Sequence, residues 1–144
     1  METRNNIFLD LDGTLLDIES RYVNLFQYMS KIYKINKISS SDFWQHKRNG
    51  KTNIQILTQL GYDNNLSNRF HNHWVSLIEE YFWLGFDKLQ VDTIEFLNNL
   101  NKKNFYTYLI TGRNNRQSLL QQLTKLEITH YFKNIFNVDT SKMV

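Results

Sequence analysis

The pattern of apolar positions along the chain first predicts helices. Apolar residues recur every three or four positions from residue 18 onward and form a stripe made of Ile18, Tyr22, Leu25, Phe26, Met29, Ile32 and Tyr33. Residues at these steps share one face of a helix, so an amphipathic helix is expected here. Asp17 directly precedes the stripe and is placed to cap the start of that helix.

Helical signals continue as far as residue 84. A second helix is expected from about Asp42, and Thr52 followed three residues later by Gln55 has the spacing of a capping box. The helix after this box is expected to stop at Gly61. A long helical stripe then follows, made of Phe70, Trp74, Leu77, Ile78 and Tyr81. The pattern therefore predicts that residues 18–84 are all-helical.

Three short apolar runs are typical of buried strands instead. They are "IFL" at residues 7–9, "FYTYLI" at 105–110 and "IFNV" at 135–138, and helical stripes separate the later ones. Alternation of strand and helix favours a parallel sheet. We therefore expect an α/β fold with a parallel-sheet core made of residues 1–17 and 85–144. An all-helical domain of residues 18–84 would be inserted into it.

Composition limits the possible functions. With 144 residues and 41% hydrophobic content the chain can build one ordinary core, and its 17 basic and 14 acidic side chains are scattered. The net charge of +3 suits a small anionic substrate better than nucleic acid, for which a basic run interleaved with aromatics is expected. There is no cysteine, which excludes disulfides and thiolate metal sites. Neither a secretory pattern nor a membrane-spanning segment is present, so we expect a cytoplasmic protein without membrane partners.

Two carboxylates follow the first apolar run directly. Asp10 and Asp12 are separated by one leucine, and residues two apart in a strand point to the same face, so their charges should repel. In an open parallel sheet this position is where ligands bind. A divalent cation would relieve the repulsion, and magnesium prefers such oxygen ligands. One carboxylate could then act as nucleophile and the other as general acid and base, while Gly13 would turn the backbone and present amides to an anion.

The string "DLDGTLLD", residues 10–17, resembles the first motif, D-x-D-G-T-L/V, of the haloacid dehalogenase-like hydrolase superfamily. Its members are mostly phosphatases and phosphomutases that act through an aspartyl-phosphate on a Rossmann-like core. The resemblance implies that Asp10 is the nucleophile and a magnesium ligand. It implies that Asp12 is the general acid and base and binds magnesium through its carbonyl. Gly13 and Thr14 complete the motif and would contact the substrate.

Two further motifs of the superfamily have candidates in this chain. The second is a Thr or Ser that ends the next core strand and holds the phosphoryl group, and Thr111 in "YLITGR" matches it. Gly112 would add an amide and Arg113 a cation, although Arg113 is equally consistent with a plain surface charge. The third motif is a lysine that offsets negative charge, and Lys142 in "DTSKMV" is the candidate; the alternative is a solvated lysine.

The fourth motif, a further magnesium-binding acid at the end of a later strand, has no counterpart before Val144. This absence favours a truncated form of a longer protein with an incomplete sheet. In the superfamily the fourth strand lies beside the first, so the strand that carries Asp10 would become an exposed edge. We expect such a chain to be weakly stable or to self-associate through that edge, and to bind magnesium weakly.

The helical insertion resembles the compact cap of phosphoglycolate phosphatase and β-phosphoglucomutase relatives, which closes over the site and selects the substrate. The loop "KRNGKT", residues 47–52, is expected to face the site, where Arg48 and Lys51 would bind a substrate anion. Solvated loop charges are the alternative explanation for these two residues.

Three functions are consistent with this sequence. The first is a magnesium-dependent phosphatase for a small phosphorylated metabolite. The second is a phosphomutase of the same superfamily, and the third is a catalytically silent binding or interaction fragment. Asp12 argues against carbon–halogen cleavage, because true dehalogenases of the superfamily replace the second aspartate.

Overall fold

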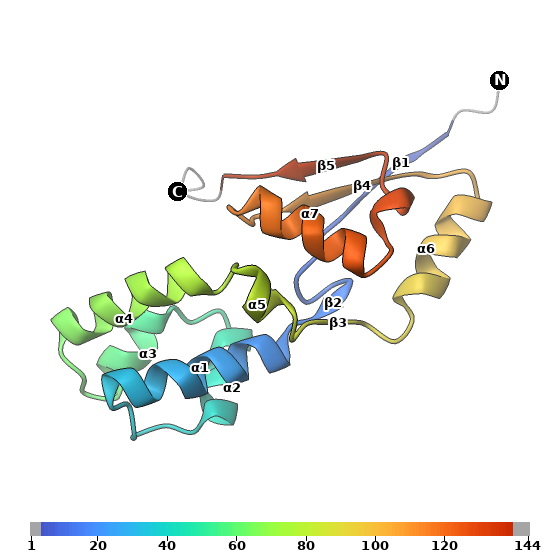
Figure 1. The fold of residues 1–144 in the computed structure, drawn as a ribbon. Coiled ribbons are helices and arrows are strands. Elements are labelled where there is room, and N and C mark those ends of the chain that lie inside the picture. Colours follow the sequence, from blue (N-terminus) through green and yellow to red (C-terminus); the bar gives the residue numbers. More distant parts are fainter. Residues whose placement is uncertain (1–3, 140–144) are drawn as a thin grey trace. The chain divides into compact units, whose positions relative to one another are not determined.

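The computed structural model describes residues 4–139. The chain forms two compact units (Figure 1). One, the core unit, comprises Met1–Ile18 and Asp87–Val144, and the other, the helical unit, comprises Glu19–Phe86. These boundaries fall one and two residues later than the sequence predicts.

The core unit is built on a parallel sheet, as expected. Its strands are β1 (Asn6–Leu9), β4 (Tyr106–Thr111) and β5 (Asn134–Asn137), in the spatial order β1-β4-β5. The register pairs Leu9 with Leu109 and Leu109 with Ile135. All three predicted strands are therefore confirmed, and β1 lies at one edge of the described sheet. Self-association through that edge stays a prediction.

Alternating burial along β4 places a hydrophobic core on one face of the sheet. Residues Thr107, Leu109 and Thr111 are buried, while their neighbours along the strand are half-buried. The helices of this unit are α6 (Thr93–Lys102), α7 (Arg116–Lys125) and the short 3-10 turn η1 (Thr129–Tyr131). Figure 1 shows α6 and α7 beside the sheet, and α6 contacts β4. Their buried leucines, Leu97, Leu100, Leu119 and Leu123, complete the core.

The opposite face of the sheet carries a row of aromatic rings. Phe8 and Tyr108 stack with ring centroids 5.0 Å apart, and Tyr108 and Phe136 stack at 6.1 Å. Phe8 and Phe136 are exposed. Residues two apart on a strand share a face, so this row follows from the same alternation that buries Leu109 on the other side.

A two-stranded antiparallel ribbon joins the ends of the core unit that flank the insertion. It consists of β2 (Leu16–Asp17) and β3 (Lys88–Leu89), with Leu16 opposite Leu89. Asp17 belongs to this ribbon and lies two residues before Glu19, the first residue of α1, so its capping of that helix stays a prediction. Strands of two residues are too short to leave an alternation pattern in the sequence.

The helical unit contains α1 (Glu19–Tyr33), α2 (Ser40–Arg48), α3 (Asn53–Gln59), α4 (Asn64–Leu77) and α5 (Tyr81–Leu84). The predicted capping box at the start of α3 is confirmed. The Thr52 hydroxyl accepts a hydrogen bond from the Gln55 N–H at 3.1 Å, and the Gln55 side chain accepts one from the Thr52 N–H at 2.9 Å. Gly61, with φ +83°, follows the end of this helix in the left-handed region that favours glycine.

The helical stripe predicted through Phe70, Trp74, Leu77, Ile78 and Tyr81 is confirmed in α4 as far as Leu77, but the chain turns before α5. The carbonyl of Ile78 accepts a hydrogen bond from the guanidinium of Arg21 at 3.2 Å, and the N–H of Glu80 donates to the carbonyl of Leu77. Arg21 is only 1% exposed and needs buried acceptors. The turn thus carries both a local hydrogen bond and a contact from α1, while the apolar spacing of the sequence continues through it.

Aromatic rings from three helices fill the helical unit. Phe26 of α1 stacks on Phe43 of α2 at 4.1 Å between centroids, and Phe43 lies 5.4 Å from Trp74 of α4. Phe70 packs against the same group, 6.0 Å from Trp74. All four side chains are buried. No helix among residues 4–139 is long and apolar enough to cross a membrane.

Lys47, near the end of α2, is held in an unfavourable environment. Burial lowers the pKa of Lys47 to about 8, and burial together with the positive charge of Lys47 lowers the pKa of His71. A lysine whose pKa is lowered by folding destabilises the folded state while it is charged, so the full destabilisation is present at pH values below its pKa in the folded protein. It disappears as pH rises toward the unfolded value of 10.5.

The variant Lys47→Met is therefore expected to raise the free energy of unfolding at pH 7. The gain should be about 1–2 kcal/mol, allowing for the partial exposure of the side chain. At pH 10 most of this gain should be gone. Urea denaturation at the two pH values measures it, and Lys31→Met, in the last turn of α1, is the matched control with little expected change. An equal effect of Lys47→Met at both pH values would contradict the prediction.

Candidate active site

The predicted site lies at the carboxyl ends of two neighbouring parallel strands. Asp10 directly follows β1, and Thr111 is the last residue of β4. Because Leu9 pairs with Leu109, Asp10 continues beside the last two residues of β4. Asp10 is exposed, so its carboxylate is accessible to a ligand in solution. The sheet thus brings together residues about one hundred positions apart in the chain.

Asp12 begins a tight turn after β1. Gly13 has φ +78°, which only glycine adopts easily, and the bridge between Asp12 and Leu16 closes the turn. The N–H of Gly13 donates to the carbonyl of Leu16 at 2.9 Å, and the N–H of Thr14 donates to Leu11 at 3.3 Å. The predicted turn is present. The N–H of Gly13 itself is used inside the turn, and the presentation of amides to an anion stays a prediction.

Arg113 makes a two-pronged ion pair with Asp12. Its Nη2 lies 2.6 Å from one carboxylate oxygen of Asp12, and its Nε lies 2.9 Å from the other. The arginine side chain is 2% exposed and that of Asp12 is 30% exposed. Arg113 is therefore not a surface charge, which excludes one of the two roles expected from the sequence. It supplies positive charge to the carboxylate pair from within the protein.

Two residues that sequence reasoning missed complete this network. The Nη1 of Arg113 donates to the side-chain oxygen of Gln122 at 2.8 Å, and its Nη2 lies 3.4 Å from Asp87. The Gln122 amide in turn donates to Asp87 at 2.8 Å. Gln122 occupies an apolar-stripe position of α7, three residues after Leu119, and that polar interruption was the available signal. Asp87 carried no comparable signal.

Thr111 lies on the buried face of β4 and is 2% exposed. Its hydroxyl oxygen accepts a hydrogen bond from the N–H of Arg113 at 3.4 Å. The carbonyl of Arg113 accepts one from the side chain of Asn137 at 2.8 Å. These bonds fix the loop after β4, which carries Gly112 and Arg113, against the end of β5.

The site and the fold agree with one family of proteins. The family model of haloacid dehalogenase-like hydrolases matches residues 7–144, which is nearly the whole chain. The chain belongs to this family. No curated protein matches it in sequence.

Several solved structures resemble this haloacid dehalogenase-like chain. A haloacid dehalogenase-like family hydrolase from Streptococcus pneumoniae is 20% identical with a TM-score of 0.72. YfnB of Bacillus subtilis, assigned as a hydrolase of the family and bound to magnesium, is 17% identical with a TM-score of 0.59. A predicted phosphoglycolate phosphatase from Haemophilus somnus is 16% identical with a TM-score of 0.58.

These three structures share the fold but are longer than this chain. The matches cover 96%, 94% and 95% of the present chain, in the same order. They cover 63%, 66% and 63% of the other proteins. The haloacid dehalogenase-like chain therefore spans less than two thirds of the length of each.

The donor atoms at the strand ends suit magnesium as this family would use it. Magnesium keeps several waters and takes one or two protein carboxylates, and the exposed carboxylate of Asp10 meets that requirement. The carbonyl of Asp12 is two residues away in the same turn. Within residues 4–139 no three His, Asp or Glu residues are grouped to hold a metal. The exposed carboxylate of Asp10 is thus the described donor that fits a magnesium ion carrying several waters.

The other predicted site residues of this haloacid dehalogenase-like chain lie in three places. Thr14 and Gly112 are exposed residues of the core unit. Arg48 and Lys51 belong to the helical unit, where Arg48 is exposed and the ammonium of Lys51 donates to the Gln59 side chain at 3.0 Å. Lys142 lies outside the described residues.

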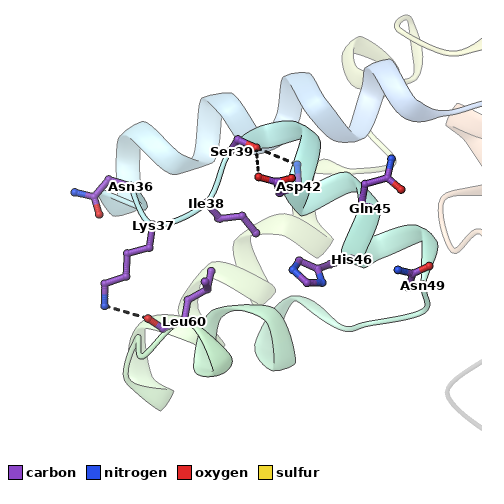
Figure 2. A pocket seen from close by; sticks show the side chains of 9 residues that line it. All are labelled: Asn36, Lys37, Ile38, Ser39, Asp42, Gln45, His46, Asn49 and Leu60. Carbon is purple, nitrogen blue, oxygen red and sulfur yellow. Dashed lines mark hydrogen bonds between the residues drawn. The ribbon is translucent and has the colours of Figure 1, made fainter.

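A separate groove of about 740 Å³ is present in the helical unit (Figure 2). It lies beside α2, and its lining residues are Asn36, Lys37, Ile38, Ser39, Asp42, Gln45, His46, Asn49 and Leu60. None of them was predicted to take part in catalysis. In the view of Figure 2 the Lys37 side chain bonds the carbonyl of Leu60, and Ser39 bonds Asp42.

Proposed function

We propose that the protein is a phosphatase that hydrolyses a small phosphorylated metabolite through an aspartyl-phosphate on Asp10. The observation that carries the proposal is the position of Asp10. Its exposed carboxylate follows β1 beside the end of β4, two residues before a second carboxylate that is held by a buried arginine. The two aspartates thus have different environments, as a nucleophile and an acid–base group require.

In the first half of the proposed reaction, a carboxylate oxygen of Asp10 attacks phosphorus. The new O–P bond forms as the bond between phosphorus and the ester oxygen breaks. Asp12 gives its proton to the departing oxygen, so that the product leaves as a neutral alcohol. The positions of both aspartates in one short turn support this division of roles.

In the second half, water attacks the phosphorus of the aspartyl-phosphate. Asp12, now a carboxylate, takes a proton from that water, and the bond between phosphorus and Asp10 breaks to release phosphate. Both aspartates return to their starting forms. We assign the carboxylate of Asp10 and the carbonyl of Asp12 as the groups that would hold magnesium, which would offset the charge of the phosphoryl group.

The substrate contacts belong to the same proposal. Thr111 and Gly112 end the strand beside Asp10 and would hold the phosphoryl group together with Thr14, while Lys142 would add positive charge. Arg48 and Lys51 would bind an anionic group in the rest of the substrate. The substrate class is supported by the charge balance and by the family. Self-association and a cytoplasmic location are part of the proposal without further support.

Phosphate release from a panel of phosphorylated metabolites tests the function. With magnesium present, the chain is expected to release inorganic phosphate from at least one sugar phosphate, phosphoglycolate or nucleoside monophosphate. A chelator should remove most of the activity, and added magnesium should restore it. Transfer of phosphate to a second sugar instead of water would indicate a phosphomutase. A folded chain that releases no phosphate from any substrate would contradict the proposal.

A further inference from the structure

The guanidinium of Arg113 uses all three of its nitrogens in the buried network. Nε and Nη2 each contact one oxygen of the Asp12 carboxylate, and Nη1 contacts Gln122. Nη2 also lies 3.4 Å from Asp87, whose side chain is fully buried. An arginine fork that meets both oxygens of a carboxylate restricts the direction of that carboxylate more than a single contact would.

Arg113 is itself restrained by hydrogen bonds to its side chain and to its backbone. The amide of Gln122 accepts from Arg113 through its oxygen and donates to Asp87 through its nitrogen, so the amide has a defined orientation. The N–H of Arg113 bonds Thr111, and its carbonyl bonds Asn137. Backbone and side chain of Arg113 are therefore both restrained, while the Asp12 side chain remains 30% exposed.

We propose that Arg113, oriented by Gln122 and Asp87, is a positioning residue that fixes the direction of the Asp12 carboxylate for proton transfer. This inference rests on the proposed function. The carboxyl group of Asp12, protonated in the first half of the reaction and ionised in the second, must point at the ester oxygen and then at the attacking water. Misplacing a reacting group by about 1 Å can cost about 10²-fold in rate. The fork limits rotation of Asp12 from the buried side, and the Asp12 side chain is 30% exposed.

The alternative is an ion pair that only ties the turn at Asp12 to the loop after β4. Both roles would stabilise the fold, so stability alone does not separate them. Arg113→Lys keeps a positive charge in the network but loses the planar fork. It also preserves the pairing of buried charges, so that neither partner is left as an uncompensated buried charge. If Arg113 positions Asp12, Arg113→Lys should lower kcat. If Arg113 only ties the turn to the loop, Arg113→Lys should leave kcat unchanged.

The experiment compares Arg113→Lys with the unchanged chain, using p-nitrophenyl phosphate and magnesium. We expect kcat to fall about 10- to 100-fold with KM within about threefold, because Asp12 acts on bonds and not on binding. Gln122→Met should lower kcat by a smaller factor, since it loosens the fork without changing charge. Arg69→Lys is the matched control, an exposed arginine of the helical unit, and should leave kcat unchanged. An Arg113→Lys protein with unaltered kcat overturns the proposal.

A second measurement does not depend on turnover. In the NMR spectrum of the unchanged chain, the Nε–H of Arg113 is expected as a separate, slowly exchanging signal. Asp12→Asn should shift it and accelerate its exchange, because the amide offers only one acceptor oxygen. A signal that does not respond to Asp12→Asn overturns the proposal, whether or not the chain is active. Absence of turnover in the unchanged chain, with the expected NMR response, would instead refute the proposed function alone.

Discussion

Replacing Asp10 by asparagine is expected to abolish phosphate release. An asparagine amide has nearly the same shape as the carboxylate but is a poor nucleophile, so the aspartyl-phosphate cannot form. We expect kcat to fall by at least about 10³-fold, comparable to the loss of a nucleophile in other enzymes that form covalent intermediates. Steady-state release of p-nitrophenol from p-nitrophenyl phosphate measures this effect. The exposed position of Asp10 predicts that the variant folds normally.

Asp92→Asn serves as the matched control for this variant. Asp92 is an exposed aspartate of the core unit, at the start of α6, and makes no capping hydrogen bond through its side chain. Its replacement should leave kcat within about twofold, since surface changes away from a site have small effects. When the unchanged chain is rapidly quenched during turnover, mass spectrometry should find phosphate on the peptide that contains Asp10. Retention of more than a tenth of the activity by Asp10→Asn would rule out this nucleophile.

Replacing Phe43 by alanine is expected to destabilise the helical unit severely. The ring of Phe43 is fully buried and lies 4.1 Å from Phe26 and 5.4 Å from Trp74, between centroids. Truncation of such a side chain removes its burial and leaves a cavity. The expected loss is about 3–5 kcal/mol in the free energy of unfolding. This is a large part of the 5–15 kcal/mol that holds an ordinary domain together.

Tryptophan fluorescence during urea denaturation measures this loss in the appropriate unit. All three tryptophans of the chain, Trp44, Trp74 and Trp83, belong to the helical unit. Phe82→Ala is the matched control, because Phe82 is 68% exposed in the same unit. It should cost less than about 1 kcal/mol. Equal midpoints for the two variants would show that the aromatic cluster is not the main source of stability.

Secondary structure was largely predictable because it depends on patterns within a few residues. The stripe that starts at Ile18 became α1, the capping box at Thr52 began α3, and "FYTYLI" became β4. The failures occurred where distant residues decide the outcome. The chain turns at Ile78, whose carbonyl accepts a hydrogen bond from Arg21 of α1, and the stripe expected to be helical is divided there. The two-stranded ribbon was not predicted either, because it pairs Asp17 with Lys88 on the other side of the insertion.

The site was predictable where a motif and a strand end coincide. Asp10 and Asp12 follow an apolar run, and Thr111 ends another, so elementary sheet geometry was sufficient to expect them at one edge. Neighbouring residues in the motif also indicated the turn at Gly13. Local sequence does not specify which amides form hydrogen bonds inside the turn, and the Gly13 N–H donates to the carbonyl of Leu16.

The sequence by itself determined the α/β organisation, the inserted helical unit, and the location of the two aspartates at the end of β1, because each depends on periodicity or adjacency. Only the tertiary structure decided the surroundings of Asp12. Arg113 looked equally suited to the surface, and neither Gln122 nor Asp87 belonged to a motif. Their contacts join positions 12, 87, 113 and 122, and depend on how β4, α7 and the β3 segment pack. Burial of a charge is settled by partners that folding brings together, and a linear pattern does not specify those partners.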